Sequence, residues 1–284
     1  MPTEEASRLA RKPPLMRTSG LSKRYSQAGL LFRKKFVIEA LVDVNLEITA
    51  GSLTALIGES GSGKSTLATC LALLESPDRG DIWFGGNEVS RCSRRQRAEL
   101  RPRIQMVFQD SAAALNPRSS AAQIVAEPLE IQRHESGPRL RARVRELMEE
   151  VGLSPDWADR RPLEFSGGQR QRLAIARAIA LRPAFLILDE SLSGLDLSTQ
   201  AQILNLLLDL QTKHSPTYLV ISHDVSVVGD IADFVAVMHQ GRIVEQGTRQ
   251  LVLGRPQHAH TQELLGSVRV LETAFRAAHA GGRE

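Results

Sequence analysis

A short glycine-rich segment near residue 60 constrains the fold of this chain more than any other part of its sequence. It follows the pattern G-x-x-x-x-G-K-[ST], which is typical of loops that bind phosphate groups. Its residues are Gly58, Glu59, Ser60, Gly61, Ser62, Gly63, Lys64 and Ser65. The apolar run Leu53–Ile57 before it is typical of a buried parallel strand, and Thr66–Leu74 after it is typical of an apolar helix. Strand, loop and helix in this order predict a P-loop.

The chemistry of this loop follows from its residue types. Glycines let the main chain wrap closely around a polyphosphate with its N–H groups pointing inward. The following helix adds the positive end of its dipole. Lys64 can supply a positive charge to the β- and γ-phosphates, and Ser65 can offer its hydroxyl to Mg²⁺. We therefore expect a nucleoside triphosphate to bind here.

A second apolar strand ends in two acidic residues. The run Phe185–Leu188 is followed by Asp189 and Glu190, and parallel sheets bind ligands beyond the carboxyl ends of their strands. Asp189 is therefore a candidate ligand for Mg²⁺, and Glu190 could orient or deprotonate an attacking water molecule. An isolated Asp-Glu pair could also be a simple surface pair, but its combination with the P-loop favours the functional interpretation.

Two further polar residues are expected at the same edge of the sheet. His223 follows a third apolar strand, Tyr218–Ile221, and Gln109 follows the segment Ile104–Phe108. We expect His223 to face the γ-phosphate, and the neutral amide of Gln109 could contact water or Mg²⁺. A lone histidine is usually structural, and either residue taken alone is a weak signal.

The segment Ser166-Gly167-Gly168-Gln169 predicts a second helix start that is open to an anion. Ser166 can cap the helix that continues through Leu173–Ile179, and the two glycines allow a ligand to approach closely. One chain already has a complete phosphate loop. A second anion-binding helix start therefore makes sense if it serves the ATP of another subunit.

The remaining sequence predicts three structural parts. Strand-like segments run from Met16 to Leu53, with Ser26–Lys35 as a loop between two of them. The region from Ala121 to Gly152 is helical in pattern, and Val235–Met238 with Arg242–Val244 predicts a terminal hairpin. The apolar stripe of the helical region comprises Leu140, Val144, Leu147, Met148 and Val151. We expect an α/β fold: a P-loop NTPase (RecA-like) core with an antiparallel β subdomain and an inserted α-helical subdomain.

Polar segments are expected at both ends of this domain. We predict a flexible tail at 1–14, the domain itself at 15–265 with its helical subdomain at about 111–165, and an extension at 266–284. His258 and His260 near the end could suggest metal binding, but a plain tail is the favoured interpretation.

Composition excludes several classes of protein. Hydrophobic residues make up 42% of the chain, which excludes a disordered body. Aromatic residues make up only 4%, which argues against a surface that stacks nucleic-acid bases. The net charge of +4 permits acidic lipids or nucleotides as partners without identifying either. Cys70 and Cys92 are expected to be ordinary thiols, and no stretch approaches the ~18 apolar residues of a membrane helix.

Together these motifs resemble the ATP-binding subunits of ABC transporters, over roughly residues 15–265. The resemblance implies that ATP and Mg²⁺ are bound and that ATP is hydrolysed. The residues it assigns to nucleotide binding are Tyr25 as the aromatic that stacks on adenine, Gly58–Thr66 as the Walker A loop, Gln109 of the Q-loop, Ser166–Gln169 as the signature motif, Asp189 of the Walker B strand and Asp196 of the D-loop. The residues it assigns to catalysis are Lys64, Gln109, Glu190 and His223. The residues it assigns to Mg²⁺, partly through water, are Ser65, Gln109 and Asp189.

Finer features resemble the oligopeptide, dipeptide and nickel importer branch of that family. They lie at 29–35, 115–118, 126–129, 200–211 and 258–265. The branch implies an ATP-hydrolysing subunit that energises an importer, with di- or oligopeptides as the first expectation. The alternatives are an importer of nickel or another small solute, and an ABC ATPase outside transport, in DNA repair or translation.

The resemblance also implies partners and a location. Two ATPase subunits, identical or homologous, would pack head to tail, so that each ATP lies between one P-loop and the signature motif of the other subunit. The pair would bind two transmembrane permease subunits and act indirectly with an extracytoplasmic solute-binding protein. We expect no nucleic-acid partner, and a peripheral position on the cytoplasmic side of the cell (inner) membrane.

Overall fold

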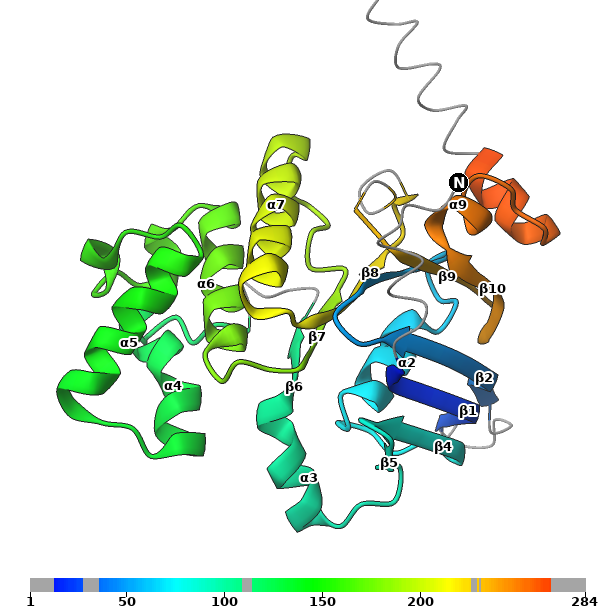
Figure 1. Ribbon diagram of the computed structural model, residues 1–284, viewed down its shortest axis with the longest axis horizontal. Helices are drawn as coiled ribbons and strands as arrows, with labels where there is room; N and C mark the ends of the chain where they lie inside the picture. The colour runs from blue at the N-terminus through cyan, green and yellow to red at the C-terminus, as the bar shows by residue number, and fades with distance from the viewer. Residues whose placement is uncertain (1–12, 28–35, 109–113, 226–228, 230, 267–284) are drawn as a thin grey trace, which may run out of the picture.

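The computed structural model describes residues 13–27, 36–108, 114–225, 229 and 231–266. Two β-sheets and a group of helices make up this part of the chain (Figure 1). Residues 28–35 of the predicted loop, Gln109 and most of both predicted terminal segments lie outside the described residues.

The smaller sheet is antiparallel and has the strand order β2-β1-β4-β5. Its strands are β1 (Pro14–Gln27), β2 (Phe36–Thr49), β4 (Arg79–Phe84) and β5 (Asn87–Glu88). Register shifts interrupt the pairing of β1 with β2 between Thr18 and Arg24. Such irregularities bend and twist a strand, and they also break the strict alternation that a sequence pattern relies on. The apolar residues of this sheet pack towards the P-loop helix.

The larger sheet has the order β10-β9-β3-β8-β7-β6. Its strands are β3 (Leu53–Ile57), β6 (Ile104–Val107), β7 (Phe185–Asp189), β8 (Thr217–Ser222), β9 (Phe234–His239) and β10 (Arg242–Thr248). All neighbouring pairs are parallel except the β9–β10 hairpin. Every residue of β3 and β7 is buried, as expected for parallel strands covered on both faces. The three predicted strands and the hairpin are confirmed.

Alternate residues of β3 contribute to two separate cores. Leu53, Ala55 and Ile57 belong to the core beneath the helical part of the molecule, whereas Leu56 belongs to the core shared with the antiparallel sheet. This central strand leads directly into the P-loop, so burial on both faces fixes the start of the loop.

The helices beside the larger sheet gather mainly on one side. They are α4 (Ala121–Arg133), α5 (Gly137–Glu150), α6 (Gly167–Ile179) and α7 (Leu197–His214), with short 3-10 turns η2 (Pro155–Trp157) and η3 (Pro162–Glu164) between α5 and α6. In Figure 1, α4, α5 and α6 lie together, far from the antiparallel sheet. The predicted apolar stripe of α5 is buried in their core. The predicted architecture of core, β subdomain and helical insertion is confirmed.

Several short elements complete the described chain, among them a helix at 259–266. The P-loop helix α2 spans Lys64–Leu71, so it begins and ends earlier than the predicted Thr66–Leu74. The arginine-rich stretch forms α3 (Arg94–Leu100) and the 3-10 turn η1 (Arg101–Arg103), and α9 (Arg249–Val252) follows β10. Both cysteines are free thiols, as expected. Within the described ranges, no helix is long and apolar enough to cross a membrane.

Candidate active site

The P-loop joins the end of β3 to the start of α2. Gly58, Gly61 and Gly63 all adopt positive φ angles, of 154°, 79° and 107°. A Cβ atom on Gly58 would lie 2.2 Å from the carbonyl oxygen of Met238, and one on Gly63 would lie 2.3 Å from that of Ala40. Two of the glycines are therefore required by close packing within the chain. Only Gly61 leaves open space, because an added Cβ there meets no atom within 4 Å.

Lys64 lies almost fully buried inside this loop, with 4% of its surface exposed. Its Nζ donates hydrogen bonds of 2.8 Å to the carbonyl oxygens of both Gly58 and Glu59. The same nitrogen lies 3.8 Å from Oε1 of Glu190. Burial lowers the pKa of Lys64, and the nearby carboxylates of Glu190, Asp189 and Glu59 oppose that shift. The loop thus presents a cation where the sequence predicted one.

Ser65 and Asp189 bring oxygen atoms together beside the lysine. The Ser65 hydroxyl donates to Oδ1 of Asp189 over 3.2 Å, which joins the start of α2 to the end of β7. Burial raises the pKa of Asp189, and the hydrogen bond from Ser65 opposes that shift. A hydroxyl and a carboxylate are the hard oxygen donors that Mg²⁺ prefers. These two residues therefore fit the predicted magnesium site.

Glu190 is held between the P-loop lysine and the predicted histidine. Its Oε2 lies 3.6 Å from Nδ1 of His223, within ion-pairing distance when the imidazole is protonated. Its backbone N–H donates to the carbonyl oxygen of Ile221 over 3.1 Å, which ties the residue to β8. Its φ angle is 41°, a left-handed conformation that costs about 1–3 kcal/mol for a non-glycine residue. The surrounding contacts hold this strained residue with its carboxylate facing the loop.

The structure brings four of the side chains singled out in the sequence to one edge of the larger sheet. They arrive together because β3, β8 and β7 are adjacent parallel strands whose carboxyl ends meet at that edge. The four are Lys64, Asp189, Glu190 and His223. The additional Gln109 lies outside the described residues.

Tyr25 lies close to the P-loop helix but makes bonds of its own. Its hydroxyl donates to Oε2 of Glu75 over 2.7 Å, and Nζ of Lys23 lies 5.6 Å from the centre of its ring. Burial and the bond to Glu75 raise the pKa of Tyr25 to about 12. The side chain is 37% exposed. Its stacking on an adenine ring stays a prediction.

The Ser166–Gln169 segment forms a capped helix start on the exposed surface. The Ser166 hydroxyl accepts from the backbone N–H of Gln169, and the Gln169 side chain accepts from the N–H of Ser166. A Cβ on Gly168 would lie 2.5 Å from Cγ2 of Thr199 in α7. Packing against α7 therefore accounts for this glycine. The explanation inferred from the sequence, that a ligand must approach closely, is therefore needed only for Gly167.

No hydrogen bond or ion pair in the described part of the chain joins this segment to its own P-loop. Figure 1 shows α6 beside α4 and α5, whereas α2 lies beside the antiparallel sheet. The structure does not bring the two predicted phosphate-binding segments together within one chain.

Asp196 caps a helix, a structural role that was not predicted from the sequence. It is the N-cap of α7, and its carboxylate accepts from the backbone N–H and the hydroxyl of Thr199 over 2.9 and 2.7 Å. These bonds lower the pKa of Asp196. Gln200 also holds the loop, since its amide donates to the carbonyl oxygens of Leu192 and Leu195. The N-cap pattern of an aspartate three residues before a threonine could have indicated the first contact.

A match to a protein-family model identifies the family of this chain. The model described as ABC transporter matches residues 41–193, which include the P-loop, the Ser166–Gln169 segment and Asp189-Glu190. The chain belongs to the ABC transporter family. This confirms the predicted family, and the ATPase class with it.

Curated relatives place it more finely within that family. The chain is 42% identical over 263 residues to the dipeptide transport ATP-binding protein DppF of Haemophilus influenzae, covering 93% of this chain and 80% of that one. It is 44% identical over 247 residues to the di/tripeptide transport ATP-binding protein DppF of Pseudomonas aeruginosa, covering 87% and 76%. It is 45% identical over 260 residues to the glutathione import ATP-binding protein GsiA of Shigella dysenteriae, where it spans 91% of this chain but only 42% of that protein.

Solved structures of the ABC transporter family share the fold. A dimeric, post-hydrolysis structure of the ATP-binding cassette MJ0796 with ADP and Pi is 28% identical, with a TM-score of 0.72, and the match covers 82% of this chain and 98% of that one. The structure of cbiO1 from Clostridium perfringens, part of the transporter complex cbiONQ, is 30% identical with a TM-score of 0.75, covering 86% and 92%.

Proposed function

We propose that this ABC transporter ATPase energises an importer of di- or oligopeptides and works as one half of an ATPase pair. The observation that carries the ATPase role is the convergence of Lys64, Asp189, Glu190 and His223 at one sheet edge. Support for the solute comes from relatives at 42–45% identity that are named for dipeptides, di/tripeptides and glutathione. All three names denote short peptides. They favour a peptide over nickel as the solute.

We propose the following roles at the site. Lys64 would exchange its two carbonyl acceptors for phosphate oxygens when ATP enters the loop. Ser65 and Asp189, with Gln109 partly through water, would hold Mg²⁺, which neutralises charge on the phosphate oxygens when it is bound. Glu190 would orient the attacking water or accept its proton, and His223 would contact the γ-phosphate.

The proposal that two ATPase subunits pair rests on the separation of the two phosphate-binding segments within one chain. Ser166 and Gly167 are exposed at the start of α6, and no hydrogen bond within the described ranges links them to their own P-loop. MJ0796 is dimeric in a structure with ADP and Pi. We propose that the Ser166–Gln169 segment completes the ATP site of a second, identical or homologous, subunit.

Replacing Ser166 by arginine is expected to abolish most turnover while the chain still binds ATP at its own P-loop. The added side chain would block the surface that meets the partner's nucleotide. Ser93→Arg is a matched control, because Ser93 is exposed and forms the same capping box with Gln96 at the start of α3. Both changes remove a cap worth about 0.5–2 kcal/mol. Turnover and nucleotide affinity, measured on each variant, separate the two effects.

A mixing experiment sharpens this test. In a head-to-tail pair of one Ser166→Arg chain with one Lys64→Ala chain, both changes fall on one ATP site and the other site stays intact. Turnover should therefore partly return when the two inactive variants are mixed. A site built within a single chain would stay inactive in every mixture.

A groove between the larger sheet and the helical part of the molecule is a candidate docking site for a membrane partner. It has a volume of about 460 Å³ and lies between β6, α4 and α6. Its lining includes the apolar side chains of Leu74, Phe108 and Ile131, which are 49%, 45% and 61% exposed. Exposed apolar residues clustered in one groove typically mark a binding surface. We propose that the transmembrane permease subunits dock here, with the ATPase on the cytoplasmic side of the membrane.

Ile131→Glu is expected to weaken binding to the permease by at least about tenfold, since an apolar interface anchor typically contributes more than 1 kcal/mol and the variant buries a charge. The ATPase activity of the isolated chain should not change. Leu251→Glu is the control, because Leu251 is 60% exposed on α9, away from the groove. Equal weakening by both variants in a pull-down with the permease would refute the docking site.

Uptake by the whole transporter tests the solute. We propose that residues 15–265 form the ATPase domain, with a tail at 1–14 and an extension at 266–284, and that an extracytoplasmic binding protein delivers the peptide. Cells with this chain and its permease should accumulate labelled di- and tripeptides, and lose this uptake with Glu190→Gln. Uptake of nickel in place of peptide would overturn the assignment of the solute but not of the ATPase.

A further inference from the structure

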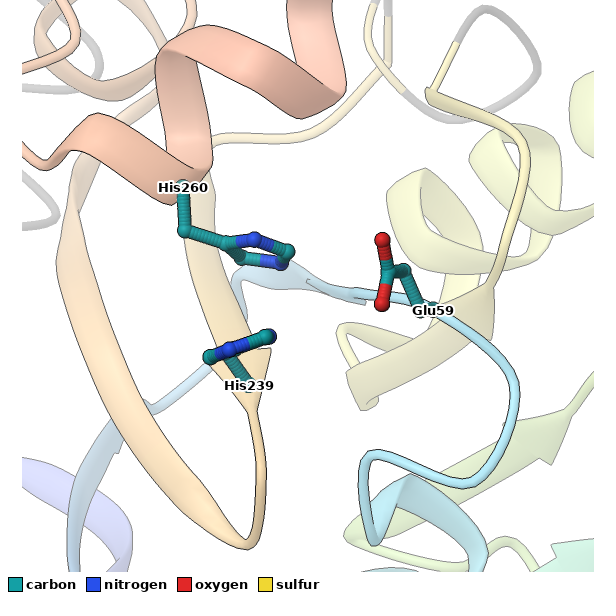
Figure 2. Close-up of side chains that lie close together, drawn as sticks. All are labelled: Glu59, His239 and His260. Atoms are coloured by element: carbon teal, nitrogen blue, oxygen red, sulfur yellow. The ribbon is translucent and has the colours of Figure 1, made fainter.

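Three metal-ligating side chains from distant parts of the chain meet beside the P-loop. Glu59 lies in the loop itself, His239 ends β9, and His260 lies in the helix at 259–266. Each offers a ligand atom, and these atoms all lie within 4.8 Å of one another. Figure 2 shows the carboxylate of Glu59 facing the edges of the two imidazole rings. The centres of the two rings are 3.7 Å apart, and their planes are inclined by 35°.

His260 carries a buried nitrogen that has no hydrogen-bond partner among the residues that the structure describes. Its side chain is 8% exposed, and its Nε2 makes no hydrogen bond within the described part of the chain. A polar group left unpaired and buried costs about 1–3 kcal/mol. The two residues it faces do not satisfy it directly. No hydrogen bond or ion pair among the described residues joins it to Glu59 or His239. The three ligand atoms are close enough for an ion to bridge them once the side chains move closer.

The chemistry of the donors selects the class of ion. Two imidazoles and one carboxylate form a ligand set that zinc uses, with one position left for water. Mg²⁺ and Ca²⁺ prefer oxygen donors throughout, so imidazoles disfavour them. Ligands about 2.0–2.2 Å from a tetrahedral zinc ion lie about 3.3–3.6 Å from each other. The three side chains would thus have to approach by up to about an ångström, and the partly buried His239 ring, now stacked on His260, would have to turn so that both nitrogens point at the ion. Glu59 is exposed and His239 is only partly buried, so both can adjust.

The main chain already holds the three segments close together. The N–H of Gly241 donates to the carbonyl oxygen of Ser62 over 2.8 Å, which fastens the β9–β10 turn to the P-loop. The backbone N–H groups of Gln257 and His258 donate to the carboxylate of Glu245 in β10, which anchors the start of the terminal helix. The ligands are therefore positioned by contacts that do not depend on the ion, as a binding site requires.

We propose that Glu59, His239 and His260 bind a divalent transition-metal ion of the zinc class. The ion would clamp the helix at 259–266 onto the P-loop. This differs from the pair suggested by sequence alone. His258 is exposed, and its Nδ1 accepts from the backbone N–H of His260 over 3.2 Å, so it does not join the cluster. The two histidines lie outside the proposed catalytic and nucleotide-binding groups, whereas Glu59 belongs to the P-loop. The proposal does not depend on the proposed transport role.

Zinc titration of the full nucleotide-free chain, in competition with a chromophoric chelator, tests the proposal. We expect one bound Zn²⁺ per chain. His239→Gln and His260→Gln should each weaken binding by at least about tenfold, because loss of an outer-shell partner alone typically costs 10–100-fold. Glu59→Gln should also weaken binding, and it changes an exposed loop residue, so it remains informative if His260→Gln fails to fold.

Two control variants locate the ion. His258→Gln removes the neighbouring exposed histidine and should leave zinc affinity unchanged. His223→Gln removes the histidine of the catalytic edge and should also leave it unchanged. Loss of zinc binding in His223→Gln, with retention in His239→Gln, would assign the ion to the catalytic edge and overturn the proposal.

Cobalt substitution tests the geometry without any assay of ATP hydrolysis. Co²⁺ bound by two imidazoles and a carboxylate in a tetrahedral site gives a strong visible absorption, whereas hexahydrated Co²⁺ absorbs weakly. We expect this band in the native chain and in His258→Gln, and its loss in His239→Gln and Glu59→Gln. A chain that binds no Co²⁺ or Zn²⁺ stoichiometrically would refute the site.

Discussion

Glu190→Gln is expected to lower the rate of ATP hydrolysis by about 10²–10⁴-fold, the usual contribution of a positioned acid–base group. The substitution keeps the size of the side chain but removes its ability to accept a proton. Glu190 faces the buried Nζ of Lys64 at 3.8 Å and Nδ1 of His223 at 3.6 Å. A water molecule that attacks the γ-phosphate above Lys64 would pass within reach of this carboxylate. Hydrolysis measured in a single turnover isolates the chemical step.

The same variant should bind ATP at least as tightly as the native chain. A carboxylate beside a triphosphate is repelled by it, and the neutral amide removes that repulsion. A loss of rate with retained affinity assigns Glu190 to catalysis and not to binding. Glu146→Gln is the control, because Glu146 is an exposed carboxylate of α5 that pairs with Arg143. Native turnover in Glu190→Gln would refute its role as a base.

The parts of the site that could be predicted from the sequence are those formed by short, continuous segments of the chain. Leu53–Ile57 and Phe185–Leu188 are apolar runs bounded by polar residues, and both are fully buried strands. Parallel strands place their carboxyl ends at one edge. The sequence alone was therefore enough to predict that Lys64, Asp189 and Glu190 meet.

Other features depend on contacts between residues that are distant in sequence. Gly168 makes room for Thr199, and Gly58 for the main chain of Met238. The sequence shows the glycine but not which neighbour requires it. His239 and His260 likewise stack only because the β9–β10 hairpin turns the terminal helix back over the P-loop. A pattern read along the chain finds His258 and His260 as a pair and misses His239.

Lys64→Ala is expected to weaken ATP binding by roughly 30- to 4,000-fold, since truncating one partner of a buried charge pair costs about 2–5 kcal/mol. Lys64 is 4% exposed and makes two hydrogen bonds to the loop. Alanine removes the positive charge that phosphate oxygens would meet. Equilibrium binding of ATP to the purified variant measures the effect.

Removing Lys64 could also weaken binding by disordering the loop, because two buried carbonyl oxygens lose their donor. Lys64→Arg separates the two causes, since it keeps the charge but presents a planar guanidinium in place of a compact ammonium. If charge dominates, Lys64→Arg should retain more affinity than Lys64→Ala at equal thermal stability. Lys213→Ala is the control, because Lys213 pairs with Glu150 on the surface of α7. Equal affinity in Lys64→Ala and Lys213→Ala would show that the buried cation does not hold the nucleotide.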